Sequence, residues 1–336
     1  GAVRGGCQAY FGYPITPQSE LLEYMSRRMV ELGRIFLQVE SEVGAINMVC
    51  GAASAGFRAM TSSSGPGISL KQEGISYIAG CELPAVIVNV MRCGPGLGGV
   101  LPAQADYSQA TKGGGHGDYH LLVLAPNSVQ EAMDLTALAF NLADKYRNPV
   151  MILADGLIGQ MMEPVELKDY DVIVPPKPWA LTGAKDRPKN LIKSLRLQPE
   201  MLEEHNRNIA RKYEAMAANE VRYAEYMLDD AEIVVVAYGT PSRVAQSAVK
   251  MARAEGINAG LFRPITLYPF PYAALRKVAE RAKAVVVVEL SMGQMAEDVR
   301  LAVAERVPVR LCNRVGGMVV TPREVAAAVS DAARRQ

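Results

Sequence analysis

A glutamate at the start of a helix rich in small residues is one of four places where this sequence offers side chains for chemistry. Residues 40–42 read Glu-Ser-Glu, and glycine and alanine are frequent in the helix that the pattern predicts over residues 41–56. The helix dipole favours an acidic residue in a first turn, which explains Glu42 without any function. The alternative is a carboxylate buried against a ligand, which the small neighbours Gly44 and Ala45 permit.

An arginine stands where a strongly apolar segment meets a glycine-rich loop. Residues 84–91 are almost wholly apolar, which predicts a strand buried on both faces. Arg92 follows this strand, and 8 of the 24 residues from 94 to 117 are glycine, more than a plain connection needs. The loop is therefore expected to press its backbone against a ligand or a partner subunit. Arg92 is suited to clamp a carboxylate with two hydrogen bonds, and a surface ion pair is the alternative.

Two further loops offer hydroxyl groups. Residues 12–17 read GYPITP and place Thr16 at a predicted helix start, where it acts as a helix N-cap or helps to receive a carboxylate. Residues 61–67 read TSSSGPG and present hydroxyls and backbone N–H groups, with Ser64 and Gly65 at the turn. A simple strand-to-helix connection also explains this second loop. The loop is not a phosphate-binding P-loop, because the lysine of that motif is absent.

The elements that position these loops alternate between strand and helix. In the first half, strands are predicted at residues 7–10, 35–39, 59–62, 84–91, 121–124 and 150–154, and helices at 17–32, 41–56, 68–80 and 128–146. This alternation predicts a doubly wound parallel α/β sheet. Ligands bind such sheets outside the carboxyl ends of the strands, and all four loops follow a predicted strand.

The chain is expected to contain two domains joined by a charged connection. Residues 1–162 form the first domain, and the chain start resembles the glycine-terminated end of a helix that precedes it. Residues 163–228 form a linker that begins with prolines and holds a helix whose apolar stripe includes Tyr223 and Met227. Between residues 183 and 228 there are 9 Lys/Arg and 7 Asp/Glu, which indicates a surface segment. The alternation resumes over residues 229–336 as a smaller α/β domain.

Composition excludes several classes of protein and site. Lys+Arg is 36 and Asp+Glu is 35, so no basic excess points to nucleic acid. The apolar runs are far shorter than the ~20 residues that span a bilayer. Five dispersed cysteines indicate a reducing, cytoplasmic setting and neither a disulfide framework nor an iron–sulfur site. With three histidines, no metal site is expected; His116 reads as a hydrogen-bonding loop residue and Cys93 as a small buried thiol.

Four motifs in order resemble the α subunit of the 2-oxoacid:ferredoxin oxidoreductases. They are GYPITPQSE at residues 12–20, SEVGA at 41–45 followed by the small residues to 56, the Arg92–Gly99 segment, and RPITLYPF at 263–270. The stretch QADY at 104–107, together with residues 112–119, is most similar to the branched-chain, or 2-oxoisovalerate, type. The resemblance covers nearly the whole chain.

The resemblance implies a fold, a reaction and a set of partners. It implies a thiamine diphosphate-binding, pyrimidine-type doubly wound sheet followed by a domain like the C-terminal domain of transketolase. The reaction is CoA-dependent oxidative decarboxylation of a 2-oxoacid, 3-methyl-2-oxobutanoate in the branched-chain type, with electrons passed to ferredoxin. A β subunit supplies the diphosphate site with Mg²⁺, a ferredoxin-like δ subunit supplies [4Fe–4S] clusters, and a γ subunit completes the complex. The diphosphate motif is absent from this chain, which fits that division.

The resemblance also assigns roles to residues. Glu42 matches the glutamate that hydrogen-bonds N1′ of the cofactor's aminopyrimidine, so that the 4′-nitrogen reaches the form that takes the C2 proton. Thr16 and Arg92 match residues that hold the substrate carbonyl and carboxylate, and Ser64 and Gly65 are expected to line the pyrimidine. Lys112 is a candidate second cation for 2-oxoglutarate.

Three alternatives remain open at this point. One is the α subunit of a 2-oxoglutarate:ferredoxin oxidoreductase. Another is an E1β-like subunit of an NAD-linked 2-oxoacid dehydrogenase, which shares the two-domain architecture. The third is a cofactor-free scaffold of the same fold, which would not need Glu42.

Overall fold

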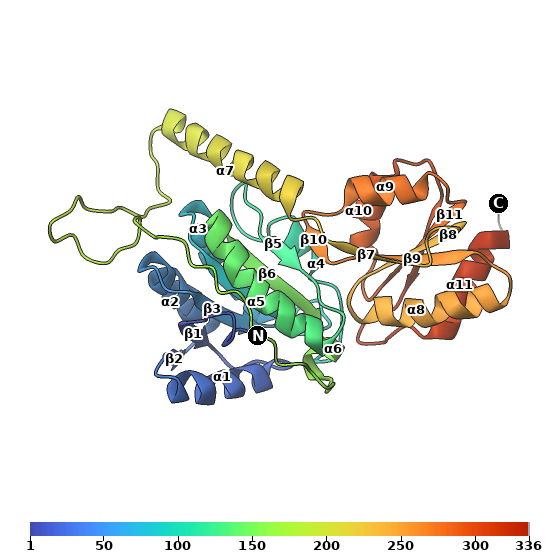
Figure 1. The fold of residues 1–336 in the computed structure, drawn as a ribbon, viewed down its shortest axis with the longest axis horizontal. Helices are drawn as coiled ribbons and strands as arrows, with labels where there is room; N and C mark the ends of the chain where they lie inside the picture. The colour runs from blue at the N-terminus through green and yellow to red at the C-terminus, as the bar shows by residue number, and fades with distance from the viewer. Residues whose placement is uncertain (335–336) are drawn as a thin grey trace.

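Residues 1–334 are described by a computed structural model in which six strands from the first half of the chain and one from the second half form a seven-stranded sheet (Figure 1). The strand order is β10-β5-β6-β4-β3-β1-β2. The strands are β1 (Ala9–Gly12), β2 (Ile35–Gln38), β3 (Ala59–Ser63), β4 (Ala85–Met91), β5 (Leu122–Leu124), β6 (Pro149–Asp155) and β10 (Thr266–Tyr268). The six strands from the first half pair in parallel, which confirms the predicted doubly wound sheet.

Helices cover both faces of this sheet because neighbouring side chains of each buried strand point to opposite sides. The helices are α1 (Ser19–Glu31), α2 (Glu42–Ser54), α3 (Pro66–Gly80) and α5 (Val129–Tyr146), with the short α4 (Tyr107–Thr111) and α6 (Gly156–Gln160). On β4, Ile87 packs with the apolar residues of α2 and α3, whereas Val86 and Val88 pack with those of α1 and α5. The apolar residues of the 84–91 segment therefore contribute side chains to the hydrophobic cores on both faces of the sheet.

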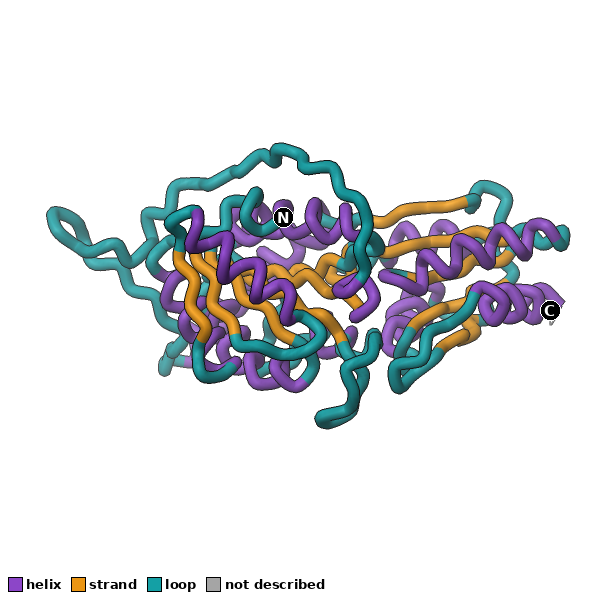
Figure 2. Tube along the Cα trace, turned by 90° about the horizontal axis from the view of Figure 1, so that it is seen from below, coloured by secondary structure: helices purple, strands orange, loops and turns teal. Residues whose placement is uncertain are grey.

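The second half builds a five-stranded sheet of its own. Its order is β12-β11-β8-β9-β7, with β7 antiparallel to β9 at the edge. The strands are β7 (Tyr223–Tyr226), β8 (Ile233–Ala237), β9 (Ala259–Pro264), β11 (Ala284–Glu289) and β12 (Val309–Asn313), and the helices are α8 (Gly239–Ala254), α9 (Tyr272–Ala279), α10 (Gln294–Val303) and α11 (Pro322–Arg334). Figure 2 shows helices on both faces of each sheet.

One strand from the second half crosses to the first sheet. β10 pairs antiparallel with β5, with Thr266 opposite Leu124 and Tyr268 opposite Val123. Two buried contacts join the halves further. The Asp155 carboxylate accepts hydrogen bonds from Thr240 N (2.8 Å) and Thr240 Oγ1 (2.7 Å) at the start of α8. Gln104 Oε1 accepts from Leu290 N at 2.9 Å. These buried hydrogen bonds fix the position of the second half of the chain against the first.

The connection between the halves is extended and then helical. Residues 161–198 form no helix or strand, and the yellow-green segment before α7 reaches away from the first sheet (Figure 1). The helix α7 (Pro199–Asn219) bears the charged surface that was expected. The predicted stripe was wrong beyond Asn219, because Tyr223 to Tyr226 pair with β9 as an edge strand instead of continuing the helix.

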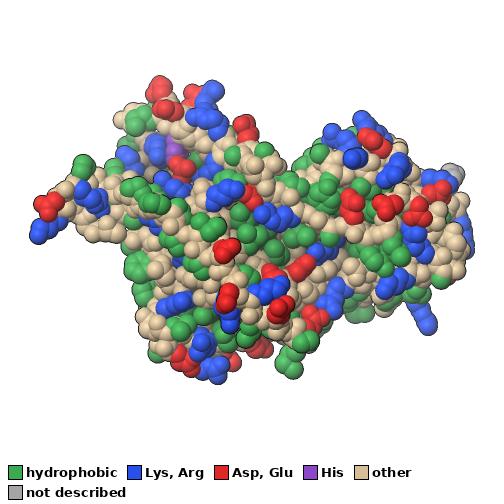
Figure 3. Space-filling view, in the orientation of Figure 1, with side chains coloured by type: hydrophobic (Ala, Val, Ile, Leu, Met, Phe, Trp, Pro, Cys, Tyr) green, Lys and Arg blue, Asp and Glu red, His purple; other side chains and the backbone are tan. Residues whose placement is uncertain are grey.

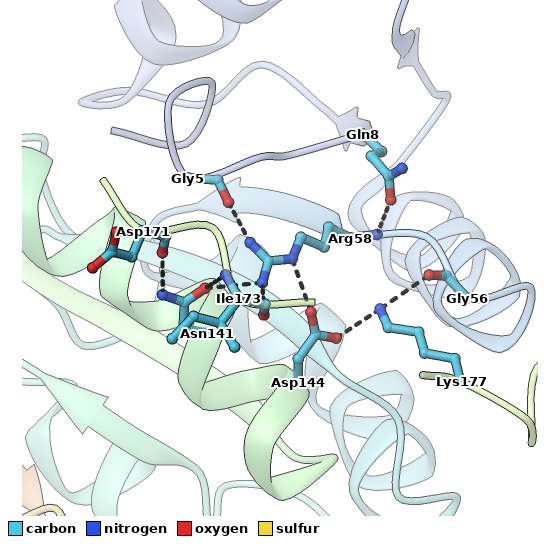
Figure 4. Close-up of polar contacts among 9 residues, drawn as sticks. All are labelled: Gly5, Gln8, Gly56, Arg58, Asn141, Asp144, Asp171, Ile173 and Lys177. Atoms are coloured by element: carbon cyan, nitrogen blue, oxygen red, sulfur yellow. Dashed lines mark hydrogen bonds and ion pairs between the residues drawn. The ribbon is translucent and has the colours of Figure 1, made fainter. Parts of the chain in front are cut away.

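A buried ion cluster ties the extended connection to the first sheet (Figure 4). Arg58 Nε lies 2.8 Å from Asp144 Oδ2, and Lys177 Nζ lies 2.7 Å from Asp144 Oδ1. The Arg58 guanidinium also donates to the carbonyls of Gly5, near the N-terminus, and Ile173, in the connection. Asp144 therefore pairs with two cations, one that directly precedes β3 and one from the connection.

Charged residues are spread over the face of the molecule seen in Figure 3, where blue and red side chains are interspersed. This agrees with a net charge of +1. No helix within residues 1–334 combines the length and apolar character needed to cross a membrane. In the same part of the chain, His, Cys, Asp and Glu side chains form no group of three or more that could hold a metal ion.

Candidate active site

The four predicted loops meet at one edge of the first sheet. Thr16 follows β1, Glu42 follows β2, Ser64 and Gly65 follow β3, and Arg92 follows β4. These strands are neighbours in the order β4-β3-β1-β2 and run in parallel, so their carboxyl ends lie side by side. This is the edge at which parallel α/β sheets bind ligands.

Glu42 is a nearly buried acidic residue at this edge of the sheet. It is the first residue of α2 and is 6% exposed. Ser41 is the N-cap and accepts a hydrogen bond from Gly44 N at 3.2 Å, so the helix is capped without Glu42. The Glu42 carboxylate has no hydrogen-bond or ion-pair partner within residues 1–334. An unpaired, nearly buried acceptor is costly, and a ligand donor would satisfy it.

A glycine makes room for that carboxylate. A Cβ atom at Gly67, near the start of α3, would lie 2.6 Å from Glu42 Oε1 and 2.2 Å from Ser63 Oγ. Any side chain at this position would collide with both groups. The close approach of α3 to the first turn of α2 therefore depends on Gly67.

Buried polar atoms without partners gather around the same edge. In residues 1–334, nine buried side-chain polar atoms lack a hydrogen-bond partner, and five of them lie on β3, β4 or the loops after them. The five are Thr61 Oγ1, Ser63 Oγ, Ser64 Oγ, Asn89 Oδ1 and Arg92 Nε. Folded proteins contain few such groups, so a cluster of them indicates a place completed by a ligand or a partner.

Arg92 lies beside the turn at Gly65. The residue is 8% exposed, and it donates to Thr16 O at 3.0 Å and to Leu97 O at 3.2 Å. A Cβ atom at Gly65 would lie 3.3 Å from Arg92 Nε, and Gly65 has a φ of +42° that disfavours other residues. Within residues 1–334 the arginine forms no ion pair, which argues against the surface ion-pair alternative, and its Nε–H has no hydrogen-bond partner there.

Thr16 is brought to Arg92 through its backbone. Its side chain is exposed, and α1 begins three residues later, with Gln18 at the cap position. The alternative in which Thr16 caps this helix is therefore wrong. Among the described residues the Thr16 hydroxyl has no hydrogen-bond partner, and its exposed side chain is accessible to a ligand.

A cavity of about 770 Å³ opens beside Arg92 and extends to the second half of the chain. The residues that line it include Gly65, Arg92, Cys93, Asp106, Leu290, Met292, Gln294 and Val315. Asp106 accepts a hydrogen bond from Asn89 Nδ2 at 3.0 Å, and burial raises the pKa of its carboxyl. The cavity combines one cation with mainly apolar walls.

Lys112 is not brought to this cavity. Its ammonium forms an ion pair with Asp298 Oδ1 at 2.5 Å, on α10. It lines a different cavity, together with His120 and Tyr268, beside the C-terminal end of α7. His116 lies in the glycine-rich loop, where its carbonyl accepts from Ser76 Oγ at 2.5 Å.

Two contributions to the site had no sequence motif. Leu290 and Gln294 follow β11, so the rule that ligands bind at carboxyl ends of strands is the signal that points to them.

The second contribution is Lys71, on α3, which is completely buried, and burial lowers the pKa of its ammonium from 10.5 to about 8. Its Nζ donates to Glu42 O at 3.3 Å. Only the folded chain reveals this lysine beside the glutamate.

Comparison with known proteins matches both halves of the chain to families. Residues 1–228 match the family described as pyruvate flavodoxin/ferredoxin oxidoreductase, thiamine diphosphate-binding. Residues 231–325 match pyruvate:ferredoxin oxidoreductase core domain II.

Curated relatives span nearly the whole chain. The ketoisovalerate oxidoreductase subunit VorB of Methanothermobacter marburgensis is 58% identical, over 97% of this chain and 92% of its own. The 2-oxoglutarate synthase subunit KorA of Methanothermobacter thermautotrophicus is 38% identical, over 97% of this chain and 94% of its own.

Solved structures share the architecture. The 2-oxoglutarate:ferredoxin oxidoreductase of Magnetococcus marinus, solved with 2-oxoglutarate, coenzyme A and succinyl-CoA bound, has a TM-score of 0.85 and 26% identity. The match covers 98% of this chain and 63% of that chain, which is therefore considerably longer. A split-gene transketolase, 17% identical with a TM-score of 0.59, shares the fold over 97% of this chain.

Proposed function

Since the chain belongs to the pyruvate flavodoxin/ferredoxin oxidoreductase family, we propose that it is the α subunit of an oxidoreductase acting on a branched-chain 2-oxoacid, 3-methyl-2-oxobutanoate. The reaction is CoA-dependent oxidative decarboxylation to acyl-CoA and CO₂, with electrons passed to ferredoxin. The 58% identity to a ketoisovalerate subunit, against 38% to a 2-oxoglutarate subunit, supports this substrate class.

The observation that carries the proposal is the unpartnered Glu42 carboxylate among unpartnered hydroxyls. Thiamine diphosphate, when bound, supplies the carbanion chemistry at the 2-keto carbon. Glu42, which is 6% exposed, has a free acceptor for a hydrogen bond from N1′–H of the pyrimidine in its imino form. Ser63 and Ser64 offer hydroxyls beside it, and Gly67, which has no side chain, lets Ser63 Oγ and Glu42 Oε1 lie close to α3. The residues present therefore fit the aminopyrimidine half of the cofactor.

The substrate cavity favours an acid with one carboxylate and an apolar side chain. Arg92 is the only lysine or arginine among the described residues that line it, and its Nε–H is free to bind the carboxylate. Thr16 lies within reach of the same guanidinium and is proposed to hold the keto oxygen. The walls formed by Ala103, Leu290 and Val315 suit a branched aliphatic chain.

The 2-oxoglutarate alternative needs a second cation, for which Lys112 was the candidate. Lys112 is already paired with Asp298 and lines another cavity, which disfavours that role. The family match weighs against the NAD-linked E1β alternative, and the unpartnered Glu42 weighs against a cofactor-free scaffold.

The remaining chemistry is proposed to lie on partner subunits. In this proposal a β subunit holds Mg²⁺, a ferredoxin-like δ subunit holds the [4Fe–4S] clusters, and a γ subunit completes a cytoplasmic complex. Exposed apolar side chains on α2 and α3, among them Val43, Met48, Leu70 and Tyr77, support a partner covering this edge.

The function is tested by producing the chain with the products of its neighbouring genes and assaying the purified complex with a panel of 2-oxoacids. The readout is CoA-dependent reduction of ferredoxin or viologen. We expect 3-methyl-2-oxobutanoate to give a higher kcat/KM than pyruvate or 2-oxoglutarate. Binding of thiamine diphosphate without turnover of any 2-oxoacid would refute the assignment.

Arg92 provides a second test, directed at the carboxylate. The Arg92→Lys change keeps the positive charge but loses the planar fork, and we expect the substrate KM to rise by roughly 10- to 100-fold, the cost of a charge-assisted hydrogen bond of about 1.5–3 kcal/mol. Steady-state kinetics with 3-methyl-2-oxobutanoate measures this value. An unchanged KM would remove the clamp assignment.

Lys112→Met is the matched control and also tests the alternative substrate. We expect this variant to leave the KM for 3-methyl-2-oxobutanoate within about twofold of the parent enzyme, because Lys112 lines a separate cavity. A selective loss of activity toward 2-oxoglutarate would instead support Lys112 as the second cation.

A further inference from the structure

The strand β4 is followed, after Arg92, by a closed turn formed by residues 93–99. Gly99 N donates to Cys93 O at 2.9 Å and closes the turn. Just beyond it, Cys93 N donates to Leu101 O at 3.0 Å, so the chain leaves the turn beside the point at which it entered. These hydrogen bonds give the segment a fixed backbone path, although it contains no helix or strand.

The tightest point of the 93–99 turn requires a glycine. A Cβ atom at Gly98 would lie 2.0 Å from Cys93 O and 2.8 Å from Gly94 Cα, and the φ of Gly98 is +57°. Both of these neighbouring atoms belong to the backbone, so no side-chain rotation relieves the collision. Any other residue at this position must therefore open the turn, even one that tolerates a positive φ.

The turn brings one backbone carbonyl to the Arg92 guanidinium. Leu97 O accepts a hydrogen bond from Arg92 Nη2 at 3.2 Å, and Thr16 O, in the loop after β1, accepts one from Arg92 Nη1 at 3.0 Å. The Leu97 side chain is 81% exposed, so its packing does not hold the turn in place. The position of the Leu97 carbonyl depends instead on the backbone contacts of the two glycines that follow it.

We propose that the 93–99 turn is a positioning element for Arg92 and that Gly98 is the residue on which this element depends. The inference rests on the proposed function of Arg92 as the clamp for the substrate carboxylate. A long arginine side chain loses rotamer freedom when it binds a ligand, which weakens binding. Two carbonyls, one on each terminal nitrogen, impose that order before the substrate arrives, and they leave Arg92 Nε–H without a partner among the described residues.

The first test is Gly98→Ala in the complete complex. We expect the KM for 3-methyl-2-oxobutanoate to rise by roughly 5- to 10-fold, because the opened turn withdraws Leu97 O and substrate binding must then order the Arg92 side chain. We expect kcat to stay within about twofold of the parent, since the lost interaction is one that ground state and transition state share. Steady-state kinetics measures both constants. Gly98 is exposed, so the turn can open into solvent without unfolding the sheet.

Gly99→Ala is a milder second variant of the same turn. A Cβ atom at Gly99 would lie 2.9 Å from Cys93 Sγ, which is a side-chain atom and can move further than the backbone can. We therefore expect a smaller rise in KM in the same direction. This variant carries the test if Gly98→Ala does not assemble with its partner subunits, and an unchanged KM in it would then overturn the proposal.

Gly33→Ala is the matched control for backbone strain. Gly33 has a φ of +63°, close to that of Gly98, but a Cβ atom there would meet nothing within 4 Å. It precedes β2 and so lies at the opposite edge of the sheet from Arg92. We expect Gly33→Ala to lower the melting temperature, because alanine is strained at a positive φ, and to leave the KM within about twofold of the parent.

A double-mutant cycle with Arg92→Lys identifies the path by which the turn acts. Residues 94–96 line the substrate cavity, so a raised KM alone would also follow from a changed cavity wall. If the turn acts through Arg92, Gly98→Ala should raise the KM by less than about twofold in the Arg92→Lys background, because the guanidinium that the turn positions is gone. Two independent effects would instead multiply.

The outcomes separate this inference from the proposed function. An unchanged KM in Arg92→Lys contradicts the carboxylate clamp itself. A raised KM in Arg92→Lys together with an unchanged KM in Gly98→Ala overturns only the role of the turn. The same holds if Gly98→Ala raises the KM equally in both backgrounds, since the turn would then act as a cavity wall, or if Gly33→Ala raises it equally, since lost stability would then be the cause.

Discussion

Replacement of Glu42 by glutamine is expected to lower kcat by about 10²–10⁴-fold, the contribution typical of a group that manages a proton in the reaction. Glutamine has nearly the same shape, but its amide is neutral and does not hold the proton shared with N1′. The other carboxylate of this loop, Glu40, is exposed, whereas Glu42 is 6% exposed. The measurement is steady-state turnover of 3-methyl-2-oxobutanoate by the purified complex at saturating thiamine diphosphate.

The Glu42→Gln chain is expected to fold. Ser41 caps α2 and the Glu42 carboxylate has no partner among the described residues, so the loss is limited to its interaction with the helix dipole, about 0.3–1 kcal/mol. Glu40→Gln is a matched control, because Glu40 is an exposed acid in the same loop, two residues away. Near-normal turnover in Glu42→Gln, or an equal loss in Glu40→Gln, would contradict the proposed role of Glu42.

The convergence of the candidate residues was predictable because it follows from backbone topology. Thr16, Glu42, Gly65 and Arg92 each follow a strand that the apolar pattern marks, and parallel strands bring their carboxyl ends together. No knowledge of side-chain contacts is needed for that result. Their roles remain proposals, since the arrangement alone does not test them.

Features that depend on long-range pairing were not predictable. β10 is three residues long, and it forms because β5 offers a free edge that only the folded chain presents. Tyr223 has the same periodicity as the end of α7, yet pairing with β9 places it in a strand. Lys71 reads as an ordinary polar residue of a helix, and its burial beside Glu42 depends on how α3 packs against α2. The proposed boundaries at residues 162 and 228 likewise stay predictions.

The second large effect concerns stability and the cluster around Asp144 (Figure 4). We expect Asp144→Asn to lower the free energy of unfolding by about 3–5 kcal/mol, because it leaves the buried Arg58 and the partly buried Lys177 without their shared anion. The asparagine side chain keeps the shape of the site, so the loss arises from charge and hydrogen bonding and not from a cavity. Urea unfolding of the full-length chain, followed by circular dichroism, measures the change.

A surface pair provides the comparison that isolates burial as the cause. Glu232 and Lys283 lie 2.9 Å apart, with side chains that are 49% and 45% exposed, and exposed pairs contribute only about 0–1 kcal/mol. Glu232→Gln should therefore change the unfolding midpoint little. Asp144→Asn should also speed proteolysis within residues 163–198, since Lys177 and the Ile173 carbonyl are tied to the first sheet through this cluster. If the two variants lose equal stability, the cluster does not hold the connection, and its other contacts, such as the Leu181 N–H hydrogen bond to Ser54 O at 2.8 Å, fix its path.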